Sequence, residues 1–151
     1  MDLILWRHAE AEDGGPDLER RLTREGLEQA ARVARWLIER LPPDFEVLAS
    51  PAARAQQTAG ALKRKIATSG RIAPGATVAA ILEAAGWPQA EHAVVLVGHQ
   101  PDLGRAAAHL VAGSGGAWSI RKGGLWWLTR RVLDDESQVV VRAVLSPELL
   151  P

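Results

Sequence analysis

Short runs of consecutive apolar residues divide the chain at regular intervals and predict strands buried on both faces of a parallel sheet. The clearest runs lie at residues 3–6, 45–49 and 93–97. A less distinct run at 77–82, before the break at Gly86-Trp87-Pro88, predicts one more short strand. Two longer segments, 125–131 and 138–145, also look like strands; they are joined around Asp134-Asp135 and predict an antiparallel hairpin at an edge of the sheet.

Between these runs, apolar residues recur at helical spacing. The pattern predicts helices over about 23–41, 51–65 and 101–112. Thr23 is a plausible cap for the first helix, and Ser50-Pro51 supplies a cap followed by a residue suited to the first helical position. Strands that alternate with helices indicate one three-layer α/β domain over residues 1–151, with a mostly parallel sheet, helices on both faces and the antiparallel edge hairpin.

Composition narrows the classes of function. Of the 151 residues 47% are hydrophobic and 24% charged, which fits one globular domain. Eighteen basic residues balance eighteen acidic ones, so no net charge attracts nucleic acid or a membrane surface. The absence of cysteine excludes disulfides, thiolate metal sites and a cysteine nucleophile, and it fits a reducing compartment. Because the first strand starts almost at Met1 and no apolar run has transmembrane length, we expect a soluble, cytoplasmic protein.

Basic and imidazole side chains follow three of the predicted strands. Arg7 and His8 end the first, Arg54 lies in the opening turn of the helix after the second, and His99 follows the run at 93–97. Ligands of parallel sheets collect beyond the carboxyl ends of the strands, where helix N-termini attract anions. Since arginine makes forked contacts with phosphate oxygens, we expect the ligand at this edge to be a phosphate or a similar oxyanion.

Other polar and aromatic residues have plainer interpretations. Glu10, Glu12 and Asp13 could hold a metal beside His8, but carboxylates after a strand usually form a solvated loop, and no metal is expected. His92 is expected to be solvated. His109 lies in an apolar helix and is expected to pack in the core of the domain. The adjacent Trp126 and Trp127 should point to opposite faces of their strand and be buried beneath helices, whereas Trp87, placed near the rim of the pocket, could contact a partner.

Four segments of the chain resemble the ordered motifs of the histidine phosphatase superfamily, the phosphoglycerate mutase-like proteins. They are residues 7–11 (RHAEA), 17–23 (DLERRLT), 50–58 (SPAARAQQT) and 97–101 (VGHQP). The chain is most similar to the small SixA-type phosphohistidine phosphatases, and the likeness spans nearly its whole length. Two positions depart from the family pattern: Ala9 stands where glycine is usual, and Arg21 where proline is common.

The resemblance implies a role for each matching residue. His8 would be the nucleophile that becomes phosphorylated, Arg7 and Arg54 would hold the phosphate, and a protonated His99 would complete the pocket. Arg20 would be a fourth, weaker phosphate contact. Catalysis would then rest on positioning and electrostatics, with no cofactor. A neutral His8 can attack phosphorus if one ring nitrogen is free and the other is fixed by a hydrogen bond, whose acceptor the sequence does not identify.

The leaving group decides the substrate. An alkoxide needs a general acid, whereas imidazole, with a pKa of about 6.5, departs with little assistance. Glu83 is the one obvious acid candidate, and its interpretation as a solvated loop residue is at least as good. The short connection at 84–92 implies, from the resemblance, an open pocket that admits a protein side chain. We therefore expect a phosphohistidine-bearing protein, such as a phosphotransfer domain, as the substrate.

Two alternatives remain open from the sequence. One is a broad small-molecule phosphomonoesterase that uses Glu83 as its general acid. The other is a phosphate-binding module without turnover, for instance because Ala9 replaces the usual glycine.

Overall fold

A computed structural model describes all residues, 1–151, and confirms the α/β architecture. Six strands form one sheet in the order β3-β2-β4-β1-β5-β6. The strands are β1 (Asp2–Arg7), β2 (Glu46–Ala49), β3 (Ile66–Thr68), β4 (Val94–Gly98), β5 (Leu125–Leu133) and β6 (Glu136–Leu145). The first four are parallel to one another, while β5 and β6 run antiparallel and form the predicted edge hairpin.

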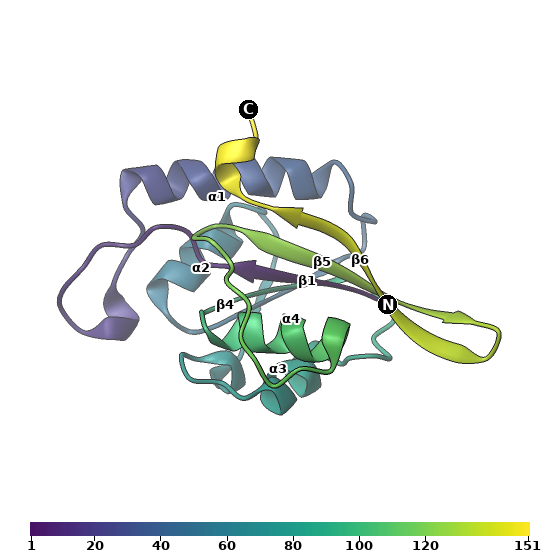
Figure 1. Ribbon diagram of the computed structural model, residues 1–151. Helices are drawn as coiled ribbons and strands as arrows, with labels where there is room; N and C mark the ends of the chain where they lie inside the picture. The colour runs from purple at the N-terminus through teal and green to yellow at the C-terminus, as the bar shows by residue number, and fades with distance from the viewer.

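Helices cover both faces of this sheet (Figure 1). The four helices are α1 (Arg24–Ile38), α2 (Ala53–Gly60), α3 (Val78–Ala85) and α4 (Asp102–Ala112). α1 and α2 pack on one face, where they bury the side chains of Ile4 and Trp6, and α3 and α4 pack on the other, over Leu3 and Leu5. Alternate residues of β1 thus enter opposite cores, which explains why this strand is apolar at every position.

α1 begins as its sequence predicts. The Thr23 hydroxyl accepts a hydrogen bond from the Gly26 N–H at 2.9 Å and so caps the helix. Val33, Ala34 and Leu37 face the core, and the helix ends at Ile38, one turn earlier than the apolar spacing suggests. None of the helices combines the length and the apolar character needed to span a bilayer.

The prediction of a strand at 77–82 is wrong. This segment belongs to α3, which Thr77 caps by accepting a hydrogen bond from the Ala80 N–H at 3.1 Å. A short apolar run fits a strand or a helix equally well by periodicity, and here four alanines favour the helix. The third parallel strand is instead β3, whose three residues, Ile66–Thr68, are too few to show a strand pattern.

The predicted helix over 51–65 is too long, since α2 covers only Ala53–Gly60. Ser50 is not the N-cap of α2, because the residue at that position is Ala52. The Ser50 hydroxyl accepts a hydrogen bond from the Ala52 N–H at 3.2 Å in the turn before the helix. After α2 the chain turns through Lys63, whose positive φ of 53° ends the helical path and leads into β3.

The predicted locations of His109 and Trp87 are wrong, whereas the prediction that Trp126 and Trp127 face opposite sides of the sheet is confirmed. His109 is exposed on α4, because the buried side chains of that helix lie on its other face. Trp87 packs against the core beneath α3 and α4, beyond the end of α3 that points away from the carboxyl edge of the sheet, so it is not at the rim of the phosphate pocket. Trp127 and Trp126 do enter opposite cores, although Trp126 is only half-buried.

Candidate active site

The sheet order brings the three strand ends of the sequence analysis to one place. β4 lies between β2 and β1, so the segments that follow these strands are neighbours. The His8 N–H donates to the Gly98 carbonyl at 3.0 Å, and the Ser50 N–H donates to the Val97 carbonyl at 3.1 Å. Residues that are far apart in the sequence are therefore fixed to one another by main-chain hydrogen bonds at the carboxyl edge of the sheet.

His8 has one ring nitrogen fixed and the other available. Its Nδ1 lies 2.8 Å from the carbonyl oxygen of Ala9. A carbonyl can only accept, so Nδ1 carries the proton and Nε2 keeps a lone pair. The Arg54 Nε–H donates to that lone pair at 3.3 Å, which is consistent with this tautomer. The Ala9 carbonyl is thus the acceptor that the sequence alone does not identify.

The environment of His8 favours its neutral form. Burial, above all, lowers its pKa to about 4; the hydrogen bond to Ala9 acts in the opposite direction, and the positive charges of Arg54, Arg7 and Arg20 lower the pKa further. At neutral pH the imidazole is therefore unprotonated and can act as a nucleophile.

Arg54, in the first turn of α2, is 3% exposed, and all three of its guanidinium nitrogens have partners. Nε contacts His8, Nη1 donates to the Asp17 main-chain carbonyl at 2.6 Å, and Nη2 lies 3.1 Å from the Asp17 carboxylate. The other carboxylate oxygen of Asp17 accepts from Arg20 at 3.1 Å. These contacts lower the pKa of Asp17, with the hydrogen bond from Arg54 as the largest cause, so its carboxyl is ionised.

Arg20 joins this cluster through Asp17. It also donates to the Glu12 carbonyl at 3.0 Å, and it has no direct hydrogen bond to His8. Arg7, at the end of β1, donates from Nη1 to the Ile120 carbonyl at 2.7 Å, while its Nε is buried without a partner. Burial lowers the pKa of this guanidinium from its ordinary value.

His99 follows β4 and lies beside His8, with 5.2 Å between the ring centroids. Its Nε2 lies 2.8 Å from the Ser50 hydroxyl, and its Nδ1 is buried without a partner. Burial first, and then repulsion from His8 in its protonated form and from Arg54, lower its pKa to about 3. With this pKa the His99 ring is neutral near pH 7, which differs from the protonated His99 of the expected mechanism.

Three polar residues that were not predicted to belong to the pocket support this cluster. Asp17 holds Arg54 and Arg20, and Ser50 contacts His99. Thr58 connects two junctions: its hydroxyl accepts from the Ala9 N–H at 3.0 Å and donates to the Arg54 carbonyl at 2.7 Å. All three lie inside the motif segments 17–23 and 50–58, which is the only signal that the sequence offers for them.

Ala9 fits its position without strain. It is fully buried, and it is not among the residues with positive φ, the conformation in which glycine would be needed. Glu10 is engaged nearby, since its carboxylate accepts from the Thr23 hydroxyl at 2.8 Å. Nowhere in residues 1–151 do three histidine or carboxylate side chains gather at metal-binding distance.

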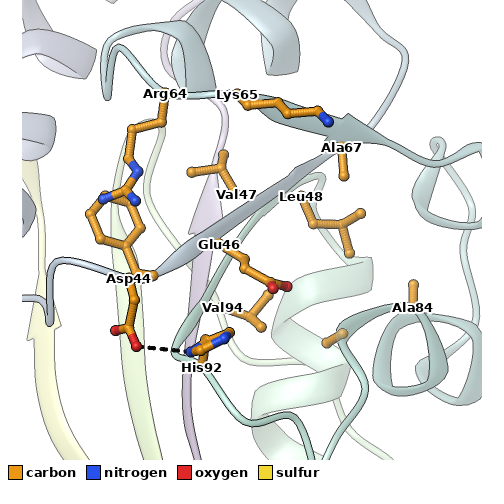
Figure 2. A pocket seen from close by; sticks show the side chains of 12 residues that line it. Asp44, Glu46, Val47, Leu48, Arg64, Lys65, Ala67, Ala84, His92 and Val94 are labelled. Carbon is orange, nitrogen blue, oxygen red and sulfur yellow. Dashed lines mark ion pairs between the residues drawn. The ribbon is translucent and has the colours of Figure 1, made fainter.

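Glu83 is not brought together with the other predicted residues. It is exposed on α3, and its carboxylate pairs with Arg71 at 3.2 Å. A hollow of about 650 Å³ lies away from His8 and His99, near the start of β2 and β4 (Figure 2). Its polar rim includes the pair of His92 with Asp44 at 2.9 Å. The cluster around His8 is therefore the candidate active site.

A family model described as the histidine phosphatase superfamily (branch 1) matches residues 3–76, which include Arg7, His8, Arg20 and Arg54. No curated protein matches the chain significantly in sequence.

Solved structures share the fold over nearly the full length. The SixA protein of Nakamurella multipartitia, assigned as a phosphohistidine phosphatase, is 24% identical, with a TM-score of 0.81 over 97% of this chain and 95% of that chain. The SixA protein of Agrobacterium tumefaciens, assigned in the same way, is 25% identical, with a TM-score of 0.78 over 97% of both chains. A protein histidine phosphatase SixA complexed with tungstate is 23% identical, with a TM-score of 0.79 over 99% of both chains.

Proposed function

Because the chain belongs to the histidine phosphatase superfamily, we propose that it is a phosphatase that hydrolyses phosphohistidine on a protein substrate, through a phosphoryl group carried by His8. The observation that carries this proposal is the state of His8. Its ring is neutral, its Nδ1 is tied to the Ala9 carbonyl, and its Nε2 lone pair faces the Arg54 guanidinium. A nucleophile fixed in this way needs no separate base to activate it.

The reaction takes two steps. In the first, a bond forms between His8 Nε2 and phosphorus while the bond between phosphorus and the substrate imidazole breaks, and the leaving imidazole takes a proton from solvent. In the second, water attacks phosphorus, the bond to Nε2 breaks, and inorganic phosphate leaves a neutral His8. Arg54 and Arg7 offset the charge on the transferred oxygens, and a bound phosphate raises the pKa of His99, so that this ring can donate to it.

The carboxylates near His8 support the choice of substrate. Asp17 is the one carboxylate bonded to the cluster, and its lowered pKa keeps it ionised and therefore unsuited to protonating a leaving group. Glu83 is held by Arg71 on α3. A pocket without a poised acid suits an imidazole leaving group better than an alkoxide. The names of the three SixA structures support the same substrate class.

The first prediction concerns the covalent step. A phosphohistidine-bearing phosphotransfer domain, labelled with ³²P, should leave an acid-labile label on this protein, and His8→Ala should remove that label and lower kcat at least about a thousandfold. His109→Ala, which changes an exposed histidine of α4, is the matched control and should leave both readouts unchanged. Phosphate binding without a labelled intermediate or turnover would instead identify a non-catalytic phosphate-binding module.

The second prediction separates the two enzyme hypotheses. Glu83→Gln should leave phosphohistidine hydrolysis within about twofold, because an imidazole departs without a general acid. A phosphomonoesterase that uses Glu83 would instead lose at least about a hundredfold in kcat on alkyl phosphates. Glu148→Gln is the control, because Glu148 also pairs with an exposed arginine, Arg121, at 2.9 Å. A preference of the wild-type protein for alkyl phosphates over phosphohistidine would contradict the proposed substrate.

A further inference from the structure

The two edges of the sheet are built very differently. β3, at one edge, has three residues and follows the basic run Lys63-Arg64-Lys65. β6, at the other edge, has ten residues and contains neither lysine nor proline. Proteins usually guard an exposed edge with short strands, lysine or proline, because its free main-chain groups can pair with another strand. β3 is guarded in this way and β6 is not.

The hairpin that carries this edge extends beyond the rest of the sheet (Figure 1). β1 pairs with β5 as far as Thr129, and Met1 adds a main-chain hydrogen bond to Arg130, so residues 131–138 form a ribbon of two strands. Such a ribbon is marginally stable without further strands beside it. Four of the eight exposed large hydrophobic side chains of the molecule also belong to β5 and β6: Val132, Leu133, Val141 and Val144.

The direction of the free main-chain groups follows from the turn. Asp134 and Asp135 have φ values of 51° and 64°, as in the two-residue turns of tight hairpins. The flanking residues, Leu133 and Glu136, then form a hydrogen-bonded pair, and such pairs alternate along the ladder. The main-chain groups of residues 136, 138 and 140 therefore point toward β5, and those of 137, 139 and 141 point outward.

We propose that β6 pairs with β6 of a second copy of this chain, antiparallel, about a twofold axis through Val139. In this register the outward groups of Val139 meet those of the partner copy's Val139, and those of Ser137 meet those of Val141. Glu136 and Arg142, the only charged residues of β6, lie three residues to either side of Val139, so they come near one another at both ends of the interface. The β-bulge between Trp127 and Leu128 skips Arg142, so the regular pairing covers residues 137–141 and the two charged side chains meet just beyond it. The edge is complementary to itself in hydrogen bonding and in charge.

The neighbouring groups are compatible with this arrangement. Arg142 already lies over the Trp127 ring, 4.8 Å from its centre, and pairs with Asp2 at 3.3 Å, so its side chain is held beside the edge. The acidic turn would lie opposite the uncharged Ala143 and Val144. Pairing of the two β6 strands would also place a further strand beside each two-stranded ribbon and so stabilise it. The free tip of the hairpin lies at the end of the sheet opposite His8, so both candidate active sites would stay open (Figure 1).

The direct test measures the mass of the intact protein against concentration by sedimentation equilibrium. The mass should rise from 16.3 kDa toward twice that value as concentration increases. Val139→Pro removes the central outward N–H, which an edge strand tolerates, and should raise the dissociation constant at least about tenfold. Wild-type protein that stays monomeric at every concentration, or a dimer indifferent to a correctly folded Val139→Pro, would overturn the proposal.

Charge exchange gives a second test that does not depend on proline. Glu136→Arg and Arg142→Glu should each weaken the dimer about tenfold, because each places like charges near one another at two sites. The double variant should restore the dissociation constant to within about threefold of the wild-type value. A double variant no tighter than the single variants would refute this register. Circular dichroism checks folding, and since turnover is not the readout, failure of the proposed function would not affect these results.

Discussion

Asp17 competes with the ligand for Arg54. Two nitrogens of the guanidinium bind the carboxylate and the carbonyl of this one residue, and the third binds His8. A phosphate that reaches His8 must therefore share Arg54 with a carboxylate of the same charge, or displace it. Asp17 holds the arginine in place before the ligand arrives, at some cost in affinity for anions.

We expect Asp17→Asn to tighten inhibition by phosphate or tungstate about fivefold, because one negative charge beside the pocket is removed. Inhibition constants of the wild-type protein and the variant, measured at the same ionic strength, check this. Glu19→Gln removes an exposed carboxylate from the same short helix, Asp17–Glu19, and should have little effect. If anions bound more weakly to Asp17→Asn, the main role of Asp17 would be to order Arg54.

The sequence identifies the charged residues of the pocket more readily than the residues that hold them. Arg7, His8, Arg54 and His99 could be selected because each follows a predicted strand. Asp17, in contrast, lies on a loop, and its contact with Arg54 depends on how that loop folds back over α2. The protonation of His99 could not be predicted either, since it depends on burial that only the packed structure creates.

Among the helices and strands, prediction succeeded where the signal was long or chemically specific. β1, β4, α1 and the hairpin follow from apolar runs, a capping threonine and turn residues. It failed between residues 60 and 85, where alanine, threonine and glycine give no clear periodicity. There the strand β3 is defined by its pairing with β2, and the helix α3 by its packing against α4, which are contacts that local sequence does not encode.

α1 rests closely on the loop that follows His8, and Gly26 makes this possible. A Cβ at this position would lie 2.0 Å from the Glu10 carbonyl oxygen. Gly26→Ala must therefore move the helix or the loop, and we expect it to lower the free energy of unfolding by about 1–3 kcal/mol and to reduce kcat. Urea denaturation and steady-state kinetics would measure the two effects.

Gly60→Ala is the matched control for this substitution. Gly60 ends α2, and no atom beyond its chain neighbours and the backbone of its own helix lies within 4 Å of the Cβ that alanine would add. Alanine should leave activity unchanged and raise the stability slightly, by up to about 1 kcal/mol, because it restricts the unfolded chain. Equal destabilisation by both substitutions would show that the contact with Glu10 is not the cause.

The stability of the folded chain should depend on the two buried histidines. Their pKa values of about 4 and about 3 lie below the ordinary value of 6.5, so the unfolded chain binds more protons in the window between these values. Stability should therefore be greatest above pH 6.5 and should fall as the pH decreases toward 4. Between pH 6.5 and 5 each histidine should account for a loss of about 1.5 kcal/mol.

Urea denaturation at several pH values would measure this loss. The double variant His8→Gln, His99→Gln should show a flatter dependence over the same window, since glutamine does not titrate. His92→Gln replaces the half-exposed histidine that pairs with Asp44 and should retain the wild-type slope. If the free energy of unfolding of the double variant fell with pH as steeply as that of the wild-type protein, the acid sensitivity would come from other groups.

Three buried side-chain atoms of the molecule have no hydrogen-bond partner, and two of them, Arg7 Nε and His99 Nδ1, belong to the candidate active site. Each unpaired donor or acceptor costs about 1–3 kcal/mol in the folded state. The protein thus carries a deficit in conformational stability at the place where it meets its ligand. An oxyanion that satisfies both atoms would recover part of that deficit on binding, so these residues exchange some conformational stability for affinity toward the ligand.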